Sequence, residues 1–206
     1  MPRKIEIGID EAGRGAVIGP MVVAGIQVEE EDVSRLARIG VKDSKKLSPA
    51  KRERLYEQII GIARCHEVRI FSAIEIDRKS LTALELEAIS EIIDLFGMPA
   101  YGRVVLDSIG KLARAKVEQV LNVGKGVDLV YEPKADDCYP VCQAASIVAK
   151  VVRDRKVKEI HRLVGYDFGK GYPTRSTTDF IRRYARNHGE LPPETRARWG
   201  NVKQMF

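Results

Sequence analysis

The chain has 206 residues, of which 44% are hydrophobic and 31% are charged, a composition that is ordinary for a soluble globular protein with one substantial domain. Its apolar runs are all shorter than the roughly 18–20 residues that cross a bilayer, and its N-terminus lacks the apolar region of a secretory signal. These features exclude a membrane-spanning protein and favour a cytoplasmic one. Three cysteines, Cys65, Cys138 and Cys142, form neither a disulfide framework nor a zinc motif, and we interpret them as small core side chains.

The positive charge is concentrated near the C-terminus. Of the formal net charge of +6, residues 151–206 carry 13 Lys and Arg against 6 Asp and Glu, whereas residues 1–150 carry 22 against 23. A nearly neutral body with a basic last quarter indicates a polyanionic partner, most simply nucleic acid. A basic face that is merely solvated is the alternative.

The first predicted elements are two strands. Ile5, Ile7 and Ile9 alternate with polar or small residues, a period of two that is typical of a half-buried strand. The strand runs into Asp10 and Glu11 and then into a Gly-Arg-Gly turn at 13–15. Residues 20–28 form a β-branched apolar run, and the short link between the two strands predicts antiparallel pairing. The acidic residues 29–32 are expected to form a solvated loop.

Helices and strands then alternate. Ser48 and Pro49 predict the start of a helix, residues 68–76 alternate as a strand, and Ser80 is expected to begin a long amphipathic helix that ends at Gly97. A short strand at 103–107, a basic helix at 111–121 and a strand at 127–131 follow.

The last part of the sequence is predicted to be helical. One long helix is expected from Tyr139, with a small apolar first half and a strongly charged second half. After a glycine-rich loop, Ser176 and Asp179 are spaced as in a capping box, and a short helix with a tail is expected at the end. This order of elements predicts a mixed α/β sheet and not a purely parallel one.

Acidic residues follow three of the predicted strands, namely Asp10, Asp107 and one of Asp136 and Asp137. An isolated acid at a strand end is more often a cap or turn residue. Several that meet at one edge of a sheet repel one another, however, and are stable together when a cation neutralises them. Oxygen-only ligands select Mg²⁺ or Mn²⁺, and two such ions can clamp an in-line phosphoryl displacement.

The ordered set of motifs resembles ribonuclease HII, the type 2 ribonuclease H family, and more closely its archaeal members. The pieces that carry the resemblance are DEAGRG at 10–15, Gly19-Pro20, DSKKL at 43–47, Leu106-Asp107, KAD at 134–136, AASIVAKV at 144–151 and GYPT at 171–174. The match covers roughly residues 5–190. Ala16 and Gln143 depart from the pattern, but neither is a proposed ligand.

The resemblance implies a ribonuclease H-like fold, in which helices flank a five-stranded mixed sheet, with a catalytic domain at 1–165 and a C-terminal helical extension at 166–206 that contributes to substrate binding. It implies a monomeric endoribonuclease that cleaves the RNA strand of RNA–DNA hybrids, and single ribonucleotides embedded in duplex DNA, leaving 3′-hydroxyl and 5′-phosphate ends. Two Mg²⁺ or Mn²⁺ ions would be held by four acids, Asp10, Glu11, Asp107 and Asp136.

The resemblance also implies substrate contacts. Gly13, Arg14 and Gly15 would read the ribose 2′-hydroxyl through backbone groups, and Tyr172 would pack on the sugar after the ribonucleotide. Glycines let the main chain approach a sugar closely, and the 2′-hydroxyl distinguishes ribose from deoxyribose. Lys45 or Lys46 would lie near the scissile or flanking phosphates.

Several alternatives stay open. Asp137 could replace Asp136 as the fourth ligand, although the spacing from Lys134 favours Asp136. The C-terminal KQMF is an incomplete sliding-clamp motif and gives weak support for that partner. A resolvase- or transposase-type nuclease of the same fold would share the acids without needing the Gly-Arg-Gly turn. A non-catalytic nucleic-acid-binding protein would bind without Mg²⁺ and release no product.

Overall fold

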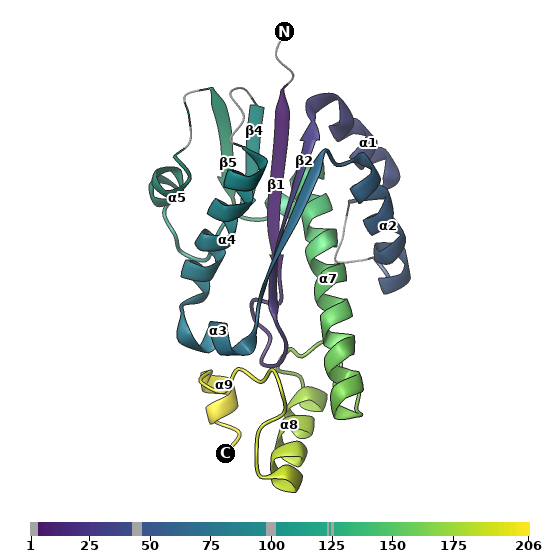
Figure 1. Cartoon of the computed structure of the whole chain (residues 1–206), viewed down its shortest axis with the longest axis vertical. Helices are drawn as coiled ribbons and strands as arrows, with labels where there is room; N and C mark the ends of the chain where they lie inside the picture. Colours follow the sequence, from purple (N-terminus) through teal and green to yellow (C-terminus); the bar gives the residue numbers. More distant parts are fainter. Residues whose placement is uncertain (1–3, 43–46, 98–101, 123, 125) are drawn as a thin grey trace.

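The computed structural model describes residues 4–42, 47–97, 102–122, 124 and 126–206 (Figure 1). Lys45 and Lys46, predicted to contact phosphates, lie outside these ranges. Among the described residues, none of the helices has the length and apolarity that a bilayer crossing requires.

A five-stranded mixed sheet forms the centre of the molecule. Its strands are β1 (Ile5–Ala12), β2 (Met21–Glu29), β3 (Cys65–Phe71), β4 (Gly102–Asp107) and β5 (Val127–Glu132). Their spatial order is β3-β2-β1-β4-β5, in which β1, β4 and β5 run parallel and β2 is antiparallel to both of its neighbours. The predicted mixed sheet and the antiparallel pairing of the first two strands are confirmed.

Helices cover both faces of this sheet (Figure 1). The α-helices are α1 (Val33–Ile39), α2 (Pro49–Ile62), α3 (Ala73–Arg78), α4 (Leu81–Phe96), α5 (Arg114–Leu121), α6 (Ala135–Cys138), α7 (Pro140–Val164), α8 (Arg175–His188) and α9 (Gly200–Lys203), with a 3₁₀ turn at Glu30–Asp32. One apolar cluster joins the sheet to α1, α2 and α7, and a second joins its other face to α3, α4 and α5.

Helix α7 lies very close to the central strand. A Cβ atom on Gly8 would stand 2.4 Å from the backbone carbonyl carbon of Val141, which is closer than real contacts allow. Glycine at this position of β1 therefore lets the first turn of α7 lie directly on the sheet. The predicted long helix is confirmed, and its apolar half is the half that packs here.

Some local predictions are wrong. The predicted strand at 68–76 ends at Phe71, because Ser72 and Glu75 form a capping box that begins α3. The last long helix starts one residue before Ser176 and is capped by the hydroxyl of Thr174, which accepts a hydrogen bond from the Thr177 N–H at 3.3 Å.

Two expectations about the surface also change. The expected acidic loop at 29–32 instead forms the end of β2 and a 3₁₀ turn, which leads into α1. Of the three cysteines, Cys142 is buried as expected, but Cys138 is exposed.

The C-terminal residues form a third apolar cluster below the sheet (Figure 1). Phe168, Phe180 and Val202 pack there against Ile18 of the loop after β1 and against Ile160 near the end of α7. Helix α7 ends at Val164, and the residue that caps it, Gly165, is left-handed with φ 64°. The predicted division between 165 and 166 falls at this cap and stays a prediction.

Candidate active site

Four predicted acids converge at one edge of the sheet. Asp10 and Glu11 lie near the end of β1, Asp107 is the last residue of β4, and Asp136 lies on α6 just after β5. Because these three strands are parallel, their carboxyl ends meet. The thiol of Cys142 lies beneath the edge, where burial, and then the negative charges of all four acids, raise its pKa well above the usual value.

Asp10 is directed towards α7. Side chains alternate along a strand, so Asp10 and Glu11 meet different helices, although their side chains stay close enough to share a hydrogen bond. Asp10 is buried, and burial, and then the charge of Glu11, raise its pKa well above the usual value. A hydrogen bond with Ser146 and the charge of Lys150 act in the opposite direction. These two residues had no role in the prediction from sequence. They lie four positions apart on one face of α7, in the half of the helix whose other residues are mostly small and apolar.

Glu11 is directed towards α4 and meets another acid, Glu85. Burial, and then the charge of Glu85, raise the pKa of Glu11. Glu85 is only 2% exposed; one of its oxygens forms an ion pair with the Arg14 guanidinium, and the other has no hydrogen-bond partner among the described residues. The sequence reasoning missed Glu85. Its signal was an acid on the apolar face of an amphipathic helix, beside Leu84 and Ile89.

Asp107 is held by backbone groups. Its Oδ1 accepts hydrogen bonds from the N–H groups of Ser108 at 2.7 Å and Lys134 at 2.8 Å. The second bond ties the end of β4 to the turn before α6. In that helix Asp136 is 4% exposed and its charge acts on Asp10, whereas Asp137 is exposed. The arrangement therefore favours Asp136 over Asp137 as the fourth acid.

The chemistry of this edge suits a hard divalent cation. Asp10, Glu11 and Glu85 all have raised pKa values because they are buried together, and added positive charge would relieve the repulsion between them. Across the described ranges, no group of three or more His, Cys, Asp or Glu side chains is already arranged as a metal site. The oxygen-rich donor set fits such an ion.

The Gly-Arg-Gly turn lies directly after β1. Gly13 is left-handed, with φ 87°, and a Cβ there would stand 2.1 Å from Nε of the buried Arg153. Gly15 is exposed, and a Cβ there would meet nothing within 4 Å. Within the described part of the chain, the N–H groups of Arg14 and Gly15 have no protein acceptor. The turn thus offers two backbone donors that no described protein group uses.

Tyr172 lies beside this turn. The residue is 39% exposed, and the guanidinium carbon of Arg153 lies 5.0 Å from the centre of its ring. Arg153 also donates from Nε to the carbonyl of Pro20 at 3.1 Å and from Nη2 to the carbonyl of Lys170 at 2.9 Å. One buried arginine therefore connects the glycine turn with the tyrosine loop.

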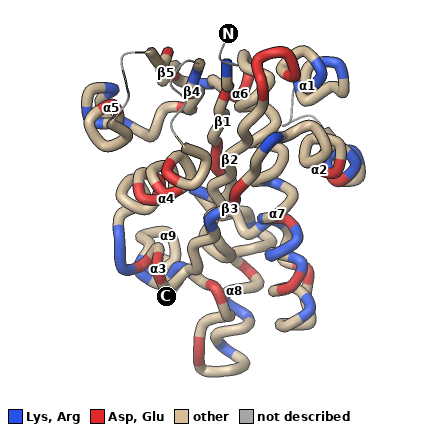
Figure 2. Tube along the Cα trace, turned by 45° about the horizontal axis from the view of Figure 1, so that its top comes forward, with Lys and Arg blue, Asp and Glu red and all other residues tan. Residues whose placement is uncertain are grey.

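The basic residues of the last quarter follow α7 and α8 (Figure 2). Some are paired within the protein, such as Arg155 with Glu53 at 2.6 Å. On α8, Arg182, Arg183 and Arg186 are exposed. The excess positive charge thus lies on the same end of the molecule as the glycine turn.

Comparison with known proteins agrees with this geometry. The family model for ribonuclease HII matches residues 7–202. The ribonuclease HII of Pyrococcus furiosus is 39% identical over 96% of this chain and 89% of its own length. Among solved structures, ribonuclease H2 of Pyrococcus horikoshii OT3 superposes with a TM-score of 0.88 at 33% identity, covering 98% and 96% of the two chains. Ribonuclease HII of Archaeoglobus fulgidus, solved in complex with PCNA, gives 0.84 at 36% identity over 97% and 96%.

Proposed function

Because the chain belongs to the ribonuclease HII family, whose members are hydrolases that cleave RNA in RNA–DNA hybrids, we propose that it cuts the RNA strand of hybrids and also single ribonucleotides embedded in duplex DNA. The reaction is a two-metal-ion hydrolysis that leaves 3′-hydroxyl and 5′-phosphate ends. One observation carries this proposal: four acids meet beside the glycine turn, namely Asp10, Glu11, Asp107 and Asp136.

The four acids hold Mg²⁺ or Mn²⁺. When bound, two such ions supply an activated water and stabilise the charge that develops on the phosphate. The protein positions the acids: α7 holds Asp10 through Ser146, and the backbone at Ser108 and Lys134 holds Asp107. The positive charge of Lys150 acts on Asp10 and partly offsets the rise in the pKa of that carboxyl.

The glycine turn and Tyr172 select the cleavage position. The exposed N–H groups at Arg14 and Gly15 reach the ribose 2′-hydroxyl, the group that deoxyribose lacks. The exposed ring of Tyr172 packs on the next sugar and so senses an RNA-to-DNA junction. Exposed arginines on α8 contact phosphates of the duplex, so the C-terminal extension contributes to binding.

An end-labelled DNA duplex with one ribonucleotide tests this function, with the same all-DNA duplex as the control. We expect one Mg²⁺-dependent cut beside the ribonucleotide and none in the control. Equal cutting of the two duplexes would favour a resolvase-type DNA nuclease. Binding without any product, at every Mg²⁺ concentration, would favour a non-catalytic binding protein.

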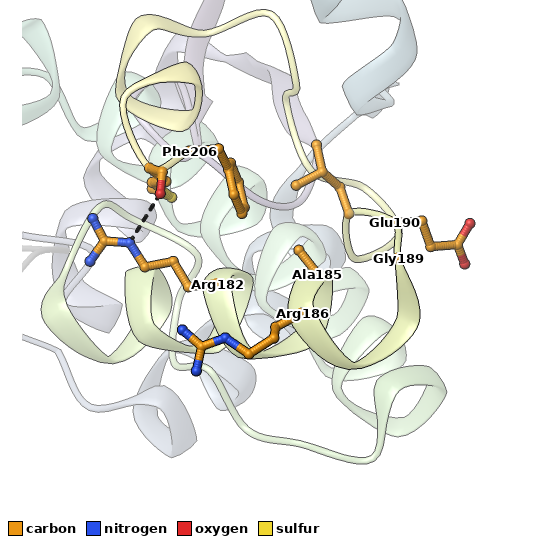
Figure 3. Close-up of a pocket in the computed structure, with 8 residues that line it drawn as sticks. Arg182, Ala185, Arg186, Gly189, Glu190 and Phe206 are labelled. Atoms are coloured by element: carbon orange, nitrogen blue, oxygen red, sulfur yellow. Dashed lines mark hydrogen bonds between the residues drawn. The ribbon is translucent and has the colours of Figure 1, made fainter.

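A sliding clamp is a separate candidate partner. The A. fulgidus relative was solved in complex with PCNA, and in this chain Phe206 is 70% exposed at the C-terminus. Phe206 borders a hollow between α8 and the last residues, where Arg182 donates to the carbonyl of Met205 (Figure 3). Calorimetry with the clamp of the same organism should show binding that is lost when residues 204–206 are deleted.

A further inference from the structure

Arg196 is a buried arginine that reaches the glycine turn from the far end of the chain. It lies between α8 and α9 and is 0% exposed. Its Nη2 donates to the carbonyl of Gly13 at 2.7 Å and to that of Gly19 at 3.1 Å. Its Nη1 donates to the carbonyl of Arg14 at 2.9 Å, and its Nε to Gly19 at 3.2 Å. All four hydrogen bonds end on one loop.

Arg196 has no carboxylate in direct contact with its guanidinium among the described residues. The nearby Arg153 is also a cation, and the carboxylates of Asp77 and Glu194 act on Arg196 less strongly than Arg153 does. Burial, and then the charge of Arg153, lower the pKa of Arg196 to about 10, so it stays protonated at neutral pH. Burying an unpaired charge is costly, and an apolar side chain of similar size would avoid that cost. Packing alone therefore gives no reason for an arginine at this position.

The backbone around Arg196 fixes its register against the loop. Its N–H donates to the carbonyl of Val17 at 2.9 Å, and the Gly19 N–H donates to the carbonyl of Glu194 at 2.8 Å. On its other side the guanidinium lies 4.8 Å from the ring centre of Trp199. The donors of Arg196 thus approach the turn from a fixed direction.

We propose that Arg196 is a positioning residue for ribose recognition, which acts by setting the orientation of two peptide groups in the glycine turn. In a planar trans peptide the N–H points opposite to the carbonyl of the preceding residue. The carbonyl of Gly13 shares its peptide plane with the Arg14 N–H, and the carbonyl of Arg14 shares the next plane with the Gly15 N–H. By drawing both carbonyls inward, Arg196 turns both N–H groups outward, towards the substrate.

This inference rests on the proposed reading of the 2′-hydroxyl by the turn. Arg196 itself touches no substrate, and it lies outside the acidic edge. Its loss should therefore change the preference for ribose and leave general duplex binding intact. A purely structural role would instead weaken folding and the binding of every duplex together.

The experiment measures that preference directly. Arg196→Met and Arg196→Lys are each combined with Asp107→Asn, which blocks cleavage, and binding is followed by fluorescence anisotropy. The two probes are a DNA duplex with one ribonucleotide and the same duplex without it. We expect Arg196→Met to lower the affinity ratio of the two duplexes at least tenfold, with all-DNA affinity unchanged within twofold. Lysine keeps the charge but loses the fork of donors, so Arg196→Lys should give an intermediate ratio.

Arg198→Met is the matched control, because Arg198 is exposed on the same segment and contacts Asp77 instead of the turn. It should leave both affinities unchanged. Circular dichroism and a cooperative melt establish folding, and Arg196→Lys serves if Arg196→Met does not fold. A folded Arg196 variant that keeps the parental ratio within twofold overturns the inference. If the Asp107→Asn parent shows no preference for the ribonucleotide, the ribose-reading function fails first, and the role of Arg196 fails with it.

Discussion

The two sides of the site bury opposite charges. At the sheet edge, burial raises the pKa values of Asp10 and Glu11, and beside the glycine turn burial lowers those of Arg153 and Arg196. In both places, burying an ionised group costs free energy, because the protein does not fully neutralise the charge. The acidic side is relieved by cations, whereas the arginines are compensated by backbone carbonyls. The acidic side is therefore prepared for a ligand, and the basic side is a rigid support.

The largest effect is expected on the acidic side. Asp107→Asn keeps the size of the side chain and its capacity to accept from Lys134, but it removes one negative charge. We expect kcat to fall by about 10³-fold or more, because electrostatic contributions to transition-state stabilisation are commonly that large. Duplex affinity should be retained. Turnover at a near-normal rate would rule out the metal-ion mechanism.

The glycine turn allows a matched pair of substitutions. In Gly13→Ala the new methyl group would collide with Arg153, and a left-handed residue would be strained, so both folding stability and cleavage should suffer. In Gly15→Ala the new methyl group would meet no protein atom within 4 Å. We expect the Gly15 variant to melt like the parent yet to lose about tenfold or more in kcat/KM, because the methyl group enters the space of the ribose.

The two variants distinguish the packing of the turn against the protein from its contact with the ribose. Thermal melts and cleavage of the single-ribonucleotide duplex are measured for both variants. Wild-type cleavage by Gly15→Ala would show that the substrate does not approach this face of the turn. A melting temperature for Gly13→Ala equal to that of the parent would contradict the role assigned to Arg153.

A smaller effect is expected at Tyr172. Its exposed ring rests on Arg153, so Tyr172→Ala removes a contact to the sugar without emptying the core. We expect roughly a tenfold loss of junction discrimination, comparing a hybrid that contains a junction with a uniform hybrid, as a stacking platform of this kind contributes on the order of 1–3 kcal/mol. Calorimetric Mg²⁺ affinity should not change; equal losses in both would argue against this role.

The smallest effect concerns stability. A carboxylate whose pKa is raised by folding destabilises the folded state at pH values above that pKa, where it is ionised in both states. Asp10→Asn should therefore raise the free energy of unfolding of the metal-free protein at pH 8, by on the order of 1 kcal/mol.

The gain in unfolding free energy should also depend on pH. As the pH falls through the raised pKa, the wild-type carboxyl becomes protonated and the gain should shrink, disappearing below the unfolded-state value near about 4. Urea titrations at several pH values measure it. A gain that is constant with pH would show that folding does not raise the pKa of Asp10.

Local signals predicted most elements. The Ser48–Pro49 and Ser80 helix starts are confirmed, because the hydroxyl of an N-cap residue satisfies amides within the same turn. The strand predicted across 68–76 failed because alternation continues into α3, and Ser72 and Glu75 together overrode it. A short apolar segment can form either a strand or a helix, and a single helix cap can decide which one forms.

The sequence alone determined the order of elements, the family resemblance and four acids at the ends of strands, because each is written in adjacent residues. Only the tertiary structure decided which distant groups share the site. Glu85 reaches Glu11 across 74 positions of sequence, and Arg196 reaches Gly13 across 183. Such contacts depend on how α4 and the C-terminal segment pack, and a buried charge far along the chain gives no local sign of the partner it will meet.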